Sequence, residues 1–166
     1  MKPQHLTILT GASRGMGLAM AEQLLAPGHT LLCISRQANP KLAERAPALG
    51  AQLMQWTEEL AQAEAVSQRL LAWLQGQPGD GFASATLINN AGVIPPIAPL
   101  SQSDPADLAH ALRVGLEAPM MLSAAFLQAT GHWPASPRLP RRGAGDTPTS
   151  RRAPTSRSAR SPPRTR

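Results

Sequence analysis

A glycine-rich turn directly after an apolar strand places the tightest limit on how this chain can fold. The run His5–Thr10 (HLTILT) is short, apolar and β-branched, as expected for a buried strand. TGASRGMG follows over residues 10–17, and apolar residues then recur at helical spacing up to Pro27-Gly28. Glycines at such a turn allow backbone N–H groups and the helix N-terminus to approach a phosphate closely. The sequence therefore predicts a strand–turn–helix unit that binds a nucleotide phosphate, in preference to a tight turn without a ligand.

Strands and helices alternate along the first 133 residues. Further strands are expected over 30–35, 51–55 and 85–89, and helices over 15–26, 40–49, 57–75 and 104–130. In the third of these helices, Thr57 opens the helix and Glu58 and Glu59 lie in the first turn, where the helix dipole favours acids. Pro119 is expected to bend the last helix. The alternation predicts an α/β fold with a parallel sheet and helices on both faces.

The charge of the chain is concentrated in its last part. Residues 1–133 contain seven basic and nine acidic residues, a net charge of −2, whereas residues 134–166 contain nine arginines and one acid, a net charge of +8. The same 33 residues hold seven prolines and a single large apolar residue, Leu139. Such a segment cannot bury enough apolar surface to offset the entropy of ordering it. We therefore expect one dinucleotide-binding domain over 1–133 and a disordered Arg/Pro/Ser-rich tail over 134–166.

Composition excludes several classes of site. The chain contains no tyrosine, so no step can use a phenol, and its one cysteine, Cys33, cannot form an intramolecular disulfide. No apolar run reaches the roughly 20 residues of a membrane helix, and the N-terminus shows no secretory signal. The default expectation is a soluble cytoplasmic protein. Four scattered histidines lack metal-ligand spacing, so no metal site is predicted at His5, His29, His110 or His132.

A second motif, Asn89-Asn90-Ala91-Gly92, follows the fourth expected strand. With the TGxxxGxG spacing of the first motif, it resembles the short-chain dehydrogenase/reductase family, which has an NNAG motif at this place. The resemblance covers roughly residues 5–130 and implies a Rossmann-like, doubly wound parallel sheet. The sheet is expected to be incomplete, with about four strands in the order 3-2-1-4. The resemblance also implies an oxidoreductase that transfers a hydride between a nicotinamide cofactor and a carbonyl or alcohol.

Candidate cofactor-binding residues come from both motifs and from the end of the second strand. An NAD-preferring site usually places an acid about 20 residues after the glycines, to bond the ribose 2′-hydroxyl. Residues 34–43 contain no acid, but Arg36 follows the strand and Arg14 lies in the glycine turn. Two guanidinium groups favour a 2′-phosphate, and hence NADP over NAD, unless Arg36 is only a solvated surface residue. The predicted cofactor-binding residues are Gly11, Ser13, Arg14, Gly15, Met16, Gly17, Arg36, Asn90, Ala91 and Gly92.

The catalytic residues that the resemblance implies are missing from this sequence. Family members use a Tyr as general acid/base, a Lys four residues later, a Ser that binds the substrate oxygen and an Asn on the preceding long helix. Hydride transfer to a carbonyl needs a matched proton donor, and a phenol reaches working pH only beside a cation. Here the only lysines are Lys2 and Lys41, and Gly115 stands where the Asn is expected, so no catalytic residue is assigned. The family's adenine-contacting Asp falls near Thr57 and Glu58, which leaves that contact open.

The arginine-rich tail has two explanations. Basicity carried by arginine alone, with many prolines, is what a GC-rich gene gives when it is read out of frame. We hypothesise that residues from about Arg138 onward are such a frameshifted product, on a gene for a full reductase. The alternative is a genuine arm that binds nucleic acid or acidic lipid. No aromatic residue interleaves the arginines, so base stacking has no support and the frameshift is favoured.

Two functions from different classes follow. The first is an NADP-dependent oxidoreductase of this family, truncated and inactive in this chain, with a small-molecule carbonyl substrate only in a full-length form. The second is a non-catalytic dinucleotide-binding module with a basic interaction tail. Neither involves a membrane, nucleic acid is not favoured as a partner, a homo-oligomer is compatible with both, and the substrate stays open. Loss of the strand next to the fourth would expose apolar sheet edge, so we also predict low stability or aggregation.

Overall fold

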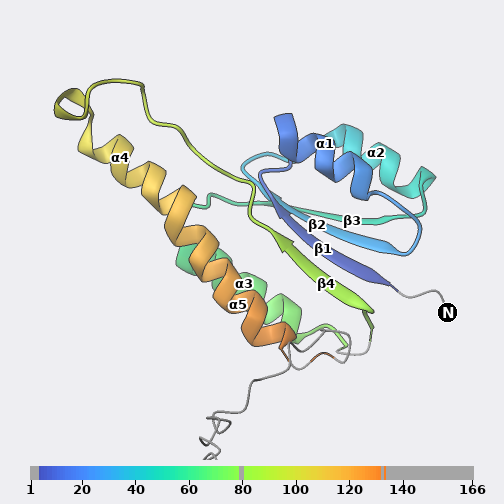
Figure 1. The fold of residues 1–166 in the computed structure, drawn as a ribbon. Helices are drawn as coiled ribbons and strands as arrows, with labels where there is room; N and C mark the ends of the chain where they lie inside the picture. Colours follow the sequence, from blue (N-terminus) through green and yellow to red (C-terminus); the bar gives the residue numbers. More distant parts are fainter. Residues whose placement is uncertain (1–3, 79–80, 132, 134–166) are drawn as a thin grey trace, which may run out of the picture. The chain divides into compact units, whose positions relative to one another are not determined.

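Four parallel strands form one sheet in the computed structural model, which describes residues 4–78, 81–131 and 133 (Figure 1). The strands are β1 (His5–Thr10), β2 (His29–Ser35), β3 (Gln52–Thr57) and β4 (Ser84–Ile88). Their order, β3-β2-β1-β4, confirms the prediction, and so does the Rossmann-like α/β fold. Each strand lies within two residues of its predicted bounds. The predicted tail, residues 134–166, lies outside the described residues.

Helices cover both faces of the sheet (Figure 1). One face carries α1 (Gly15–Leu24) and α2 (Pro40–Ala48), and the other carries α3 (Ala63–Gln75) and α5 (Ala118–Thr130). A loop after β4 leads through a 3₁₀ turn, η1 (Leu100–Gln102), to α4 (Pro105–Leu112). Within the residues that the structure describes, no helix is long and apolar enough to cross a membrane.

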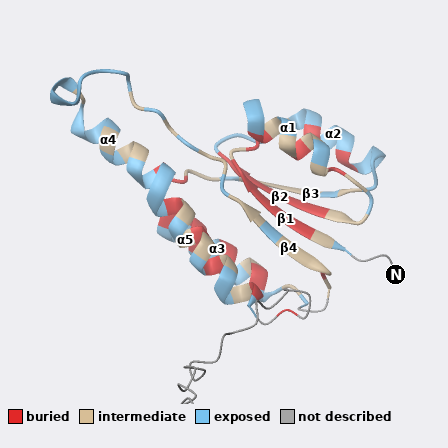
Figure 2. Ribbon diagram, in the orientation of Figure 1, coloured by how far each residue is buried: buried red, intermediate tan, exposed pale blue. Residues whose placement is uncertain are grey.

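The core lies in two layers because alternate strand residues point to opposite faces of the sheet. Leu6 and Ile8 of β1 pack in a cluster with buried residues of α3 and α5. Leu9 of β1 and Cys33 of β2 pack in a second cluster, with residues of α1 and α2. Both central strands are almost entirely buried, and their red segments stand out in Figure 2. Burial on both faces is typical of parallel strands covered by helices.

The helix predicted to open at Thr57 begins six residues later. Thr57 is the last residue of β3, and α3 starts at Ala63. The residues between them form a turn in which the Glu59 side chain accepts a hydrogen bond from the Ala61 N–H, at 3.2 Å. The prediction was wrong because Thr57 pairs with Ser35 of β2 as the last residue of the strand, and such tertiary pairing outweighs a local preference for helix. Glu58 follows the last residue of β3 and therefore lies at the carboxyl edge of the sheet.

A π-helical turn, η2 (Arg113–Glu117), interrupts the long helix that was predicted as continuous. Pro119 has no N–H to bond to the Gly115 carbonyl four residues earlier, and its ring crowds that carbonyl. The Ala118 N–H bonds instead to the Arg113 carbonyl, five residues back. The interruption therefore begins at Arg113, six residues before the proline that was expected to bend the helix.

Candidate functional site

The carboxyl edge of the sheet contains a cavity of about 340 Å³. All ten residues predicted to bind a cofactor lie in its lining: Gly11, Ser13, Arg14, Gly15, Met16, Gly17, Arg36, Asn90, Ala91 and Gly92. The other lining residues were not among those predicted to bind the cofactor, and they are Ile34, Ser35, Glu58, Glu59, Leu60, Val93 and Val114. The fold thus brings together the segments that follow each of the four strands.

Three glycines shape the turn after β1, two by their backbone angles and one by a close contact. Gly11 and Gly15 have positive φ angles of 72° and 58°, which residues with a Cβ rarely adopt. No atom lies within 4 Å of a Cβ built on Gly15, so the backbone there borders open space. A Cβ on Gly17 would overlap the Gly11 carbonyl oxygen and the Asn90 amide. Helix α1 can therefore approach the end of β1 this closely only with glycine at position 17.

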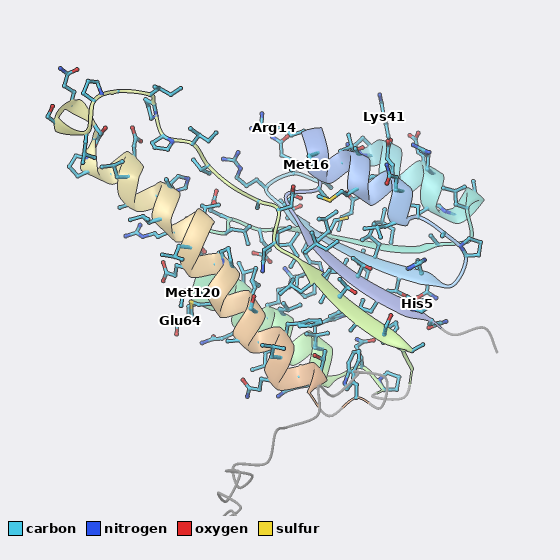
Figure 3. All side chains as sticks on the ribbon, in the orientation of Figure 1. His5, Arg14, Met16, Lys41, Glu64 and Met120 are labelled. Carbon is cyan, nitrogen blue, oxygen red and sulfur yellow. The ribbon has the colours of Figure 1, made fainter. Side chains whose placement is uncertain are left out.

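The N-terminus of α1 lies in the cavity wall without a side-chain cap. Arg14 occupies the capping position, makes no side-chain hydrogen bond to the helix, and no acid follows in the first turn. Free N–H groups and the positive end of the helix dipole favour an anion at such a terminus. The side chains of Arg14 and Met16 extend from this end of the helix (Figure 3), and Met16 is 72% exposed. The arrangement therefore fits a ligand with a phosphate beside an apolar group.

The two sequence motifs are joined by hydrogen bonds at the end of β1. Thr10 Oγ1 accepts bonds from the N–H groups of Asn90 and Ala91, at 2.9 and 3.0 Å. The Asn90 side-chain amide donates to the carbonyls of Thr10 and Gly11, at 3.0 and 3.3 Å. Thr10 is buried, so these bonds are sheltered from water. The glycine turn and the segment after β4 are thereby fixed relative to each other.

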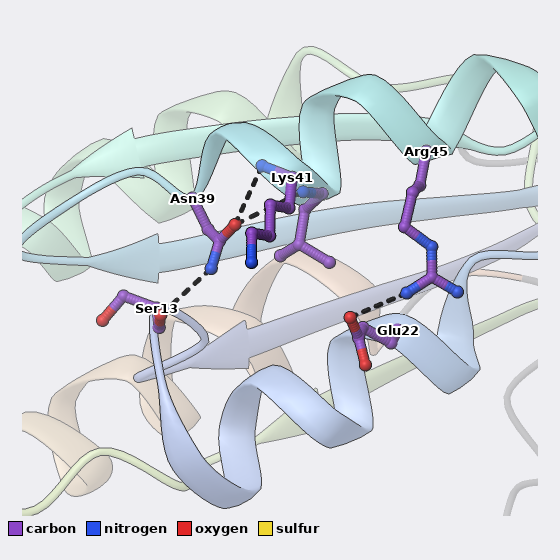
Figure 4. A network of polar contacts seen from close by, with 6 residues as sticks. Ser13, Glu22, Asn39, Lys41 and Arg45 are labelled. Carbon is purple, nitrogen blue, oxygen red and sulfur yellow. Dashed lines mark hydrogen bonds and ion pairs between the residues drawn. The ribbon is translucent and has the colours of Figure 1, made fainter.

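A second set of bonds connects the glycine turn to the loop that carries Arg36. The Asn39 side chain caps α2 by accepting a bond from the Lys41 N–H at 3.0 Å, and its amide donates to the Ser13 carbonyl at 3.2 Å (Figure 4). The Asn39 N–H donates to Gln55 Oε1 of β3, at 2.7 Å. The sequence predicted the helix over 40–49, which Asn39 precedes, but not the further bonds of this side chain. These bonds connect the glycine turn, the start of α2 and strand β3.

Four charged side chains line the cavity, namely Arg14, Arg36, Glu58 and Glu59. Of the two residues near the family's adenine-contacting Asp, Glu58 lies in the lining and Thr57 does not. The Glu58 N–H donates to the Ser35 carbonyl at 3.0 Å, which places it beside the end of β2. The signal that could have found Glu58 is topological, because residues that follow neighbouring parallel strands share one edge of the sheet.

The π-helical turn η2 contributes one residue, Val114, to the cavity lining. Val114 is buried and lines the cavity, whereas the adjacent Gly115 is exposed, with no atom within 4 Å of a Cβ built there. Gly115 is the position where the resemblance leads one to expect an Asn. Over residues 4–78, 81–131 and 133, the structure contains no group of three or more His, Cys, Asp or Glu side chains that could hold a metal ion.

Comparison with known proteins assigns the family. The family model described as short chain dehydrogenase matches residues 5–133. A benzil reductase ((S)-benzoin forming) from Bacillus cereus is 29% identical over 132 residues, which cover 80% of this chain and 53% of that protein. The chain spans about half the length of the curated relatives it matches.

Solved structures agree with this match. A short-chain dehydrogenase/reductase SDR from Burkholderia vietnamiensis has 40% sequence identity and a TM-score of 0.63, covering 76% of this chain and 59% of that one. A metagenomic short-chain oxidoreductase (SDR) in complex with NADP has 28% identity and a TM-score of 0.67, covering 76% of this chain and 57% of that one. The residues matched by the family model include both motifs and all four strands. The chain therefore belongs to the short-chain dehydrogenase/reductase family of oxidoreductases, which bind nicotinamide dinucleotides.

Proposed function

We propose that this chain binds NADP(H) in the cavity at the carboxyl edge of the sheet, as the cofactor-binding part of an oxidoreductase. The observation that carries the proposal is the uncapped N-terminus of α1 in a cavity that also contains Arg14 and Arg36. The N–H groups of Gly15 and Met16 would hold the pyrophosphate. The two arginines would hold the 2′-phosphate, and residues 90–92 would complete the site.

The preference for NADP over NAD rests on the charge at the end of β2. Arg36 is the residue that follows this strand, and residues 34–43 contain no acid that could bond a free ribose 2′-hydroxyl. A guanidinium group binds a phosphate through paired, charge-assisted hydrogen bonds. Among the solved structures similar to this chain, one is in complex with NADP and another is in complex with NAD, so the preference rests on the charge at the end of β2.

Reduction of a carbonyl needs more than the cofactor can provide. NADPH supplies the hydride when it is bound, but a separate group must protonate the carbonyl oxygen. The 166 residues contain no tyrosine, and the lysines are Lys2 and Lys41. We therefore propose that this chain binds the cofactor without reducing a carbonyl. In this proposal, a form read in frame beyond about Arg138 would carry the catalytic residues and act on a carbonyl substrate.

A second candidate function is a non-catalytic dinucleotide-binding module with a basic interaction tail. The absence of tyrosine together with the nine arginines of residues 134–166 favours it. Resequencing the gene and translating all three frames downstream of codon 134 separates the two functions. An apolar strand, a Ser and a Tyr-x-x-x-Lys pattern in another frame would support the truncated reductase. Their absence from every frame would support the module.

Titration of the 166-residue chain with NADPH and NADH tests the cofactor, with the fluorescence of the reduced nicotinamide as the signal. We expect NADPH to bind about tenfold more tightly than NADH, and Arg36→Gln to weaken NADPH about tenfold while changing NADH less than about twofold. The matched control is Arg45→Gln, because Arg45 pairs with Glu22 at 2.7 Å outside the cavity lining (Figure 4). Binding of neither nucleotide would contradict the proposal. Equal binding of both would contradict the NADP preference.

A turnover assay tests the absence of catalysis. Benzil is the first carbonyl to try, because a benzil reductase is among the relatives. We expect no benzil-dependent oxidation of NADPH by the 166-residue chain, at protein concentrations where binding is saturated. A rate that depends on both benzil and protein, and that Arg36→Gln reduces, would show that the chain is catalytic after all.

A further inference from the structure

The cavity that should accept a 2′-phosphate contains as many acids as arginines. Its charged lining residues are Arg14, Arg36, Glu58 and Glu59. The proposed ligand is strongly anionic, so a carboxylate in the same cavity repels the phosphate and competes for the arginines. Compensation of either carboxylate would therefore favour a phosphorylated ligand.

Arg69 compensates Glu58 from outside the cavity. Arg69 lies on α3, is absent from the cavity lining, and its guanidinium forms an ion pair with the Glu58 carboxylate. The same guanidinium lies over the ring of Trp56, 4.2 Å from its centroid. Trp56 packs edge-on against Trp73 of α3, with centroids 5.8 Å apart. The guanidinium is thus held by a carboxylate and by an aromatic face, which together fix its position.

Glu58 lies close to the segment that selects the cofactor. Its N–H donates to the Ser35 carbonyl at 3.0 Å, and Arg36 is the next residue. Without Arg69, the Glu58 carboxylate would be an unpaired charge in the same cavity as the Arg36 guanidinium. The two would attract each other and leave less positive potential for a phosphate. With Arg69 paired to Glu58, the charge of Arg36 stays available.

We infer that Arg69 is a positioning residue that sets the preference for the phosphorylated cofactor by neutralising Glu58. This inference rests on the proposed NADP(H) site. It assigns a selectivity role to a residue that does not line the site. It also explains how an acid can remain in a cavity for a phosphorylated ligand.

The test compares the dissociation constants of NADPH and NADH for the 166-residue chain and for Arg69→Gln. We expect Arg69→Gln to reduce the preference for NADPH about three- to tenfold, with most of the change in NADPH, and less so at high salt because screening weakens the repulsion. The control is Arg45→Gln. Arg45 and Arg69 have the same exposed side-chain fraction, 51%, and each pairs with one glutamate, but the Arg45 partner, Glu22, does not line the cavity.

Two further variants separate charge compensation from a structural role. Arg69→Gln combined with Glu58→Gln removes the unpaired carboxylate and should restore the preference, as should Arg69→Lys, which keeps the charge. Tryptophan emission should shift in Arg69→Gln and not in Arg45→Gln, since only Arg69 lies over Trp56. Equal weakening of both nucleotides by Arg69→Gln, or no recovery in the double variant, would overturn the inference alone. Failure of the unmodified chain to bind either nucleotide would overturn the proposed function as well.

Discussion

The two strands that flank β1 differ in burial even at the position where both contain a leucine. Leu32 of β2 and Leu87 of β4 are both in register with Ile8 of β1, and all three belong to the cluster that includes α3 and α5 residues. Leu32 is completely buried, whereas Leu87 is only partly buried. β2 has a strand on each side, while β4 pairs only with β1 in the part of the chain that the structure describes. The difference therefore comes from the number of neighbouring strands and not from residue type.

The same contrast extends beyond the sheet. Figure 2 shows exposed residues along the loop after β4 and along α4. Among the described residues, Met16 and Leu49 are the exposed large apolar side chains that precede β4. The others follow it: Ile94, Ile97, Leu100, Leu112, Leu116, Met120 and Leu127. Apolar surface of this kind favours association. The low stability or aggregation expected from an exposed sheet edge stays a prediction, and this surface supports it.

Truncating the two matched leucines gives the largest expected effect. Leu32→Ala should lower the free energy of unfolding by about 2–5 kcal/mol, because it leaves a cavity at a fully buried site. Leu87→Ala should lower it by about 1 kcal/mol, since part of that side chain is already in contact with water. Urea unfolding followed by circular dichroism measures both. Equal losses would show that Leu87 is as well covered in solution as Leu32, and would contradict the comparison.

The pH dependence of stability tests whether Cys33 of β2 is buried in solution. Burial raises the pKa of its thiol from 9.0 to about 12. The folded state therefore keeps the thiol proton at a pH where the unfolded state has lost it. The contribution of the thiol to the free energy of unfolding is complete below pH 9 and is lost as the pH rises toward 12. We expect a loss of about 1 kcal/mol between about pH 8 and pH 10 that Cys33→Ala does not show. The free energy of unfolding is measured in urea at each pH for both proteins. If it falls equally with pH in both, the pKa of the thiol is not raised in the folded state.

The smallest expected effect concerns the edge of β4 that has no neighbouring strand among the described residues. Thr86 is an exposed residue of this strand, which contains no charge and no proline. Thr86→Lys should leave the free energy of unfolding within about 0.5 kcal/mol and reduce aggregation, because charge on an edge strand opposes pairing between copies. Static light scattering during incubation measures the effect. Thr86→Val is the uncharged control, and equal scattering by the two variants would exclude the edge as the site of association.

Much of the fold could be predicted because its signals are local. An apolar, β-branched run predicts β1, and the proline at position 40 predicts the start of α2. Glycines predict the turn after β1, and Gly11 and Gly15 have the positive φ angles that favour glycine there. The helix expected from Thr57 begins only at Ala63, because Thr57 pairs with Ser35 of β2. The ten predicted cofactor residues lie together, but their role in binding stays a prediction.

The sequence by itself determined the strand–turn–helix unit, the family motifs and the absence of a phenol, because these depend on residue type and short spacing. Only the tertiary structure decided that Glu58 and Val114 join the glycine turn, and that Arg69 on α3 neutralises Glu58. It also decided that two leucines in register with one isoleucine differ in burial. The physical reason is the same in each case, since the contacts join residues far apart in the chain, and no local pattern encodes which segments become neighbours.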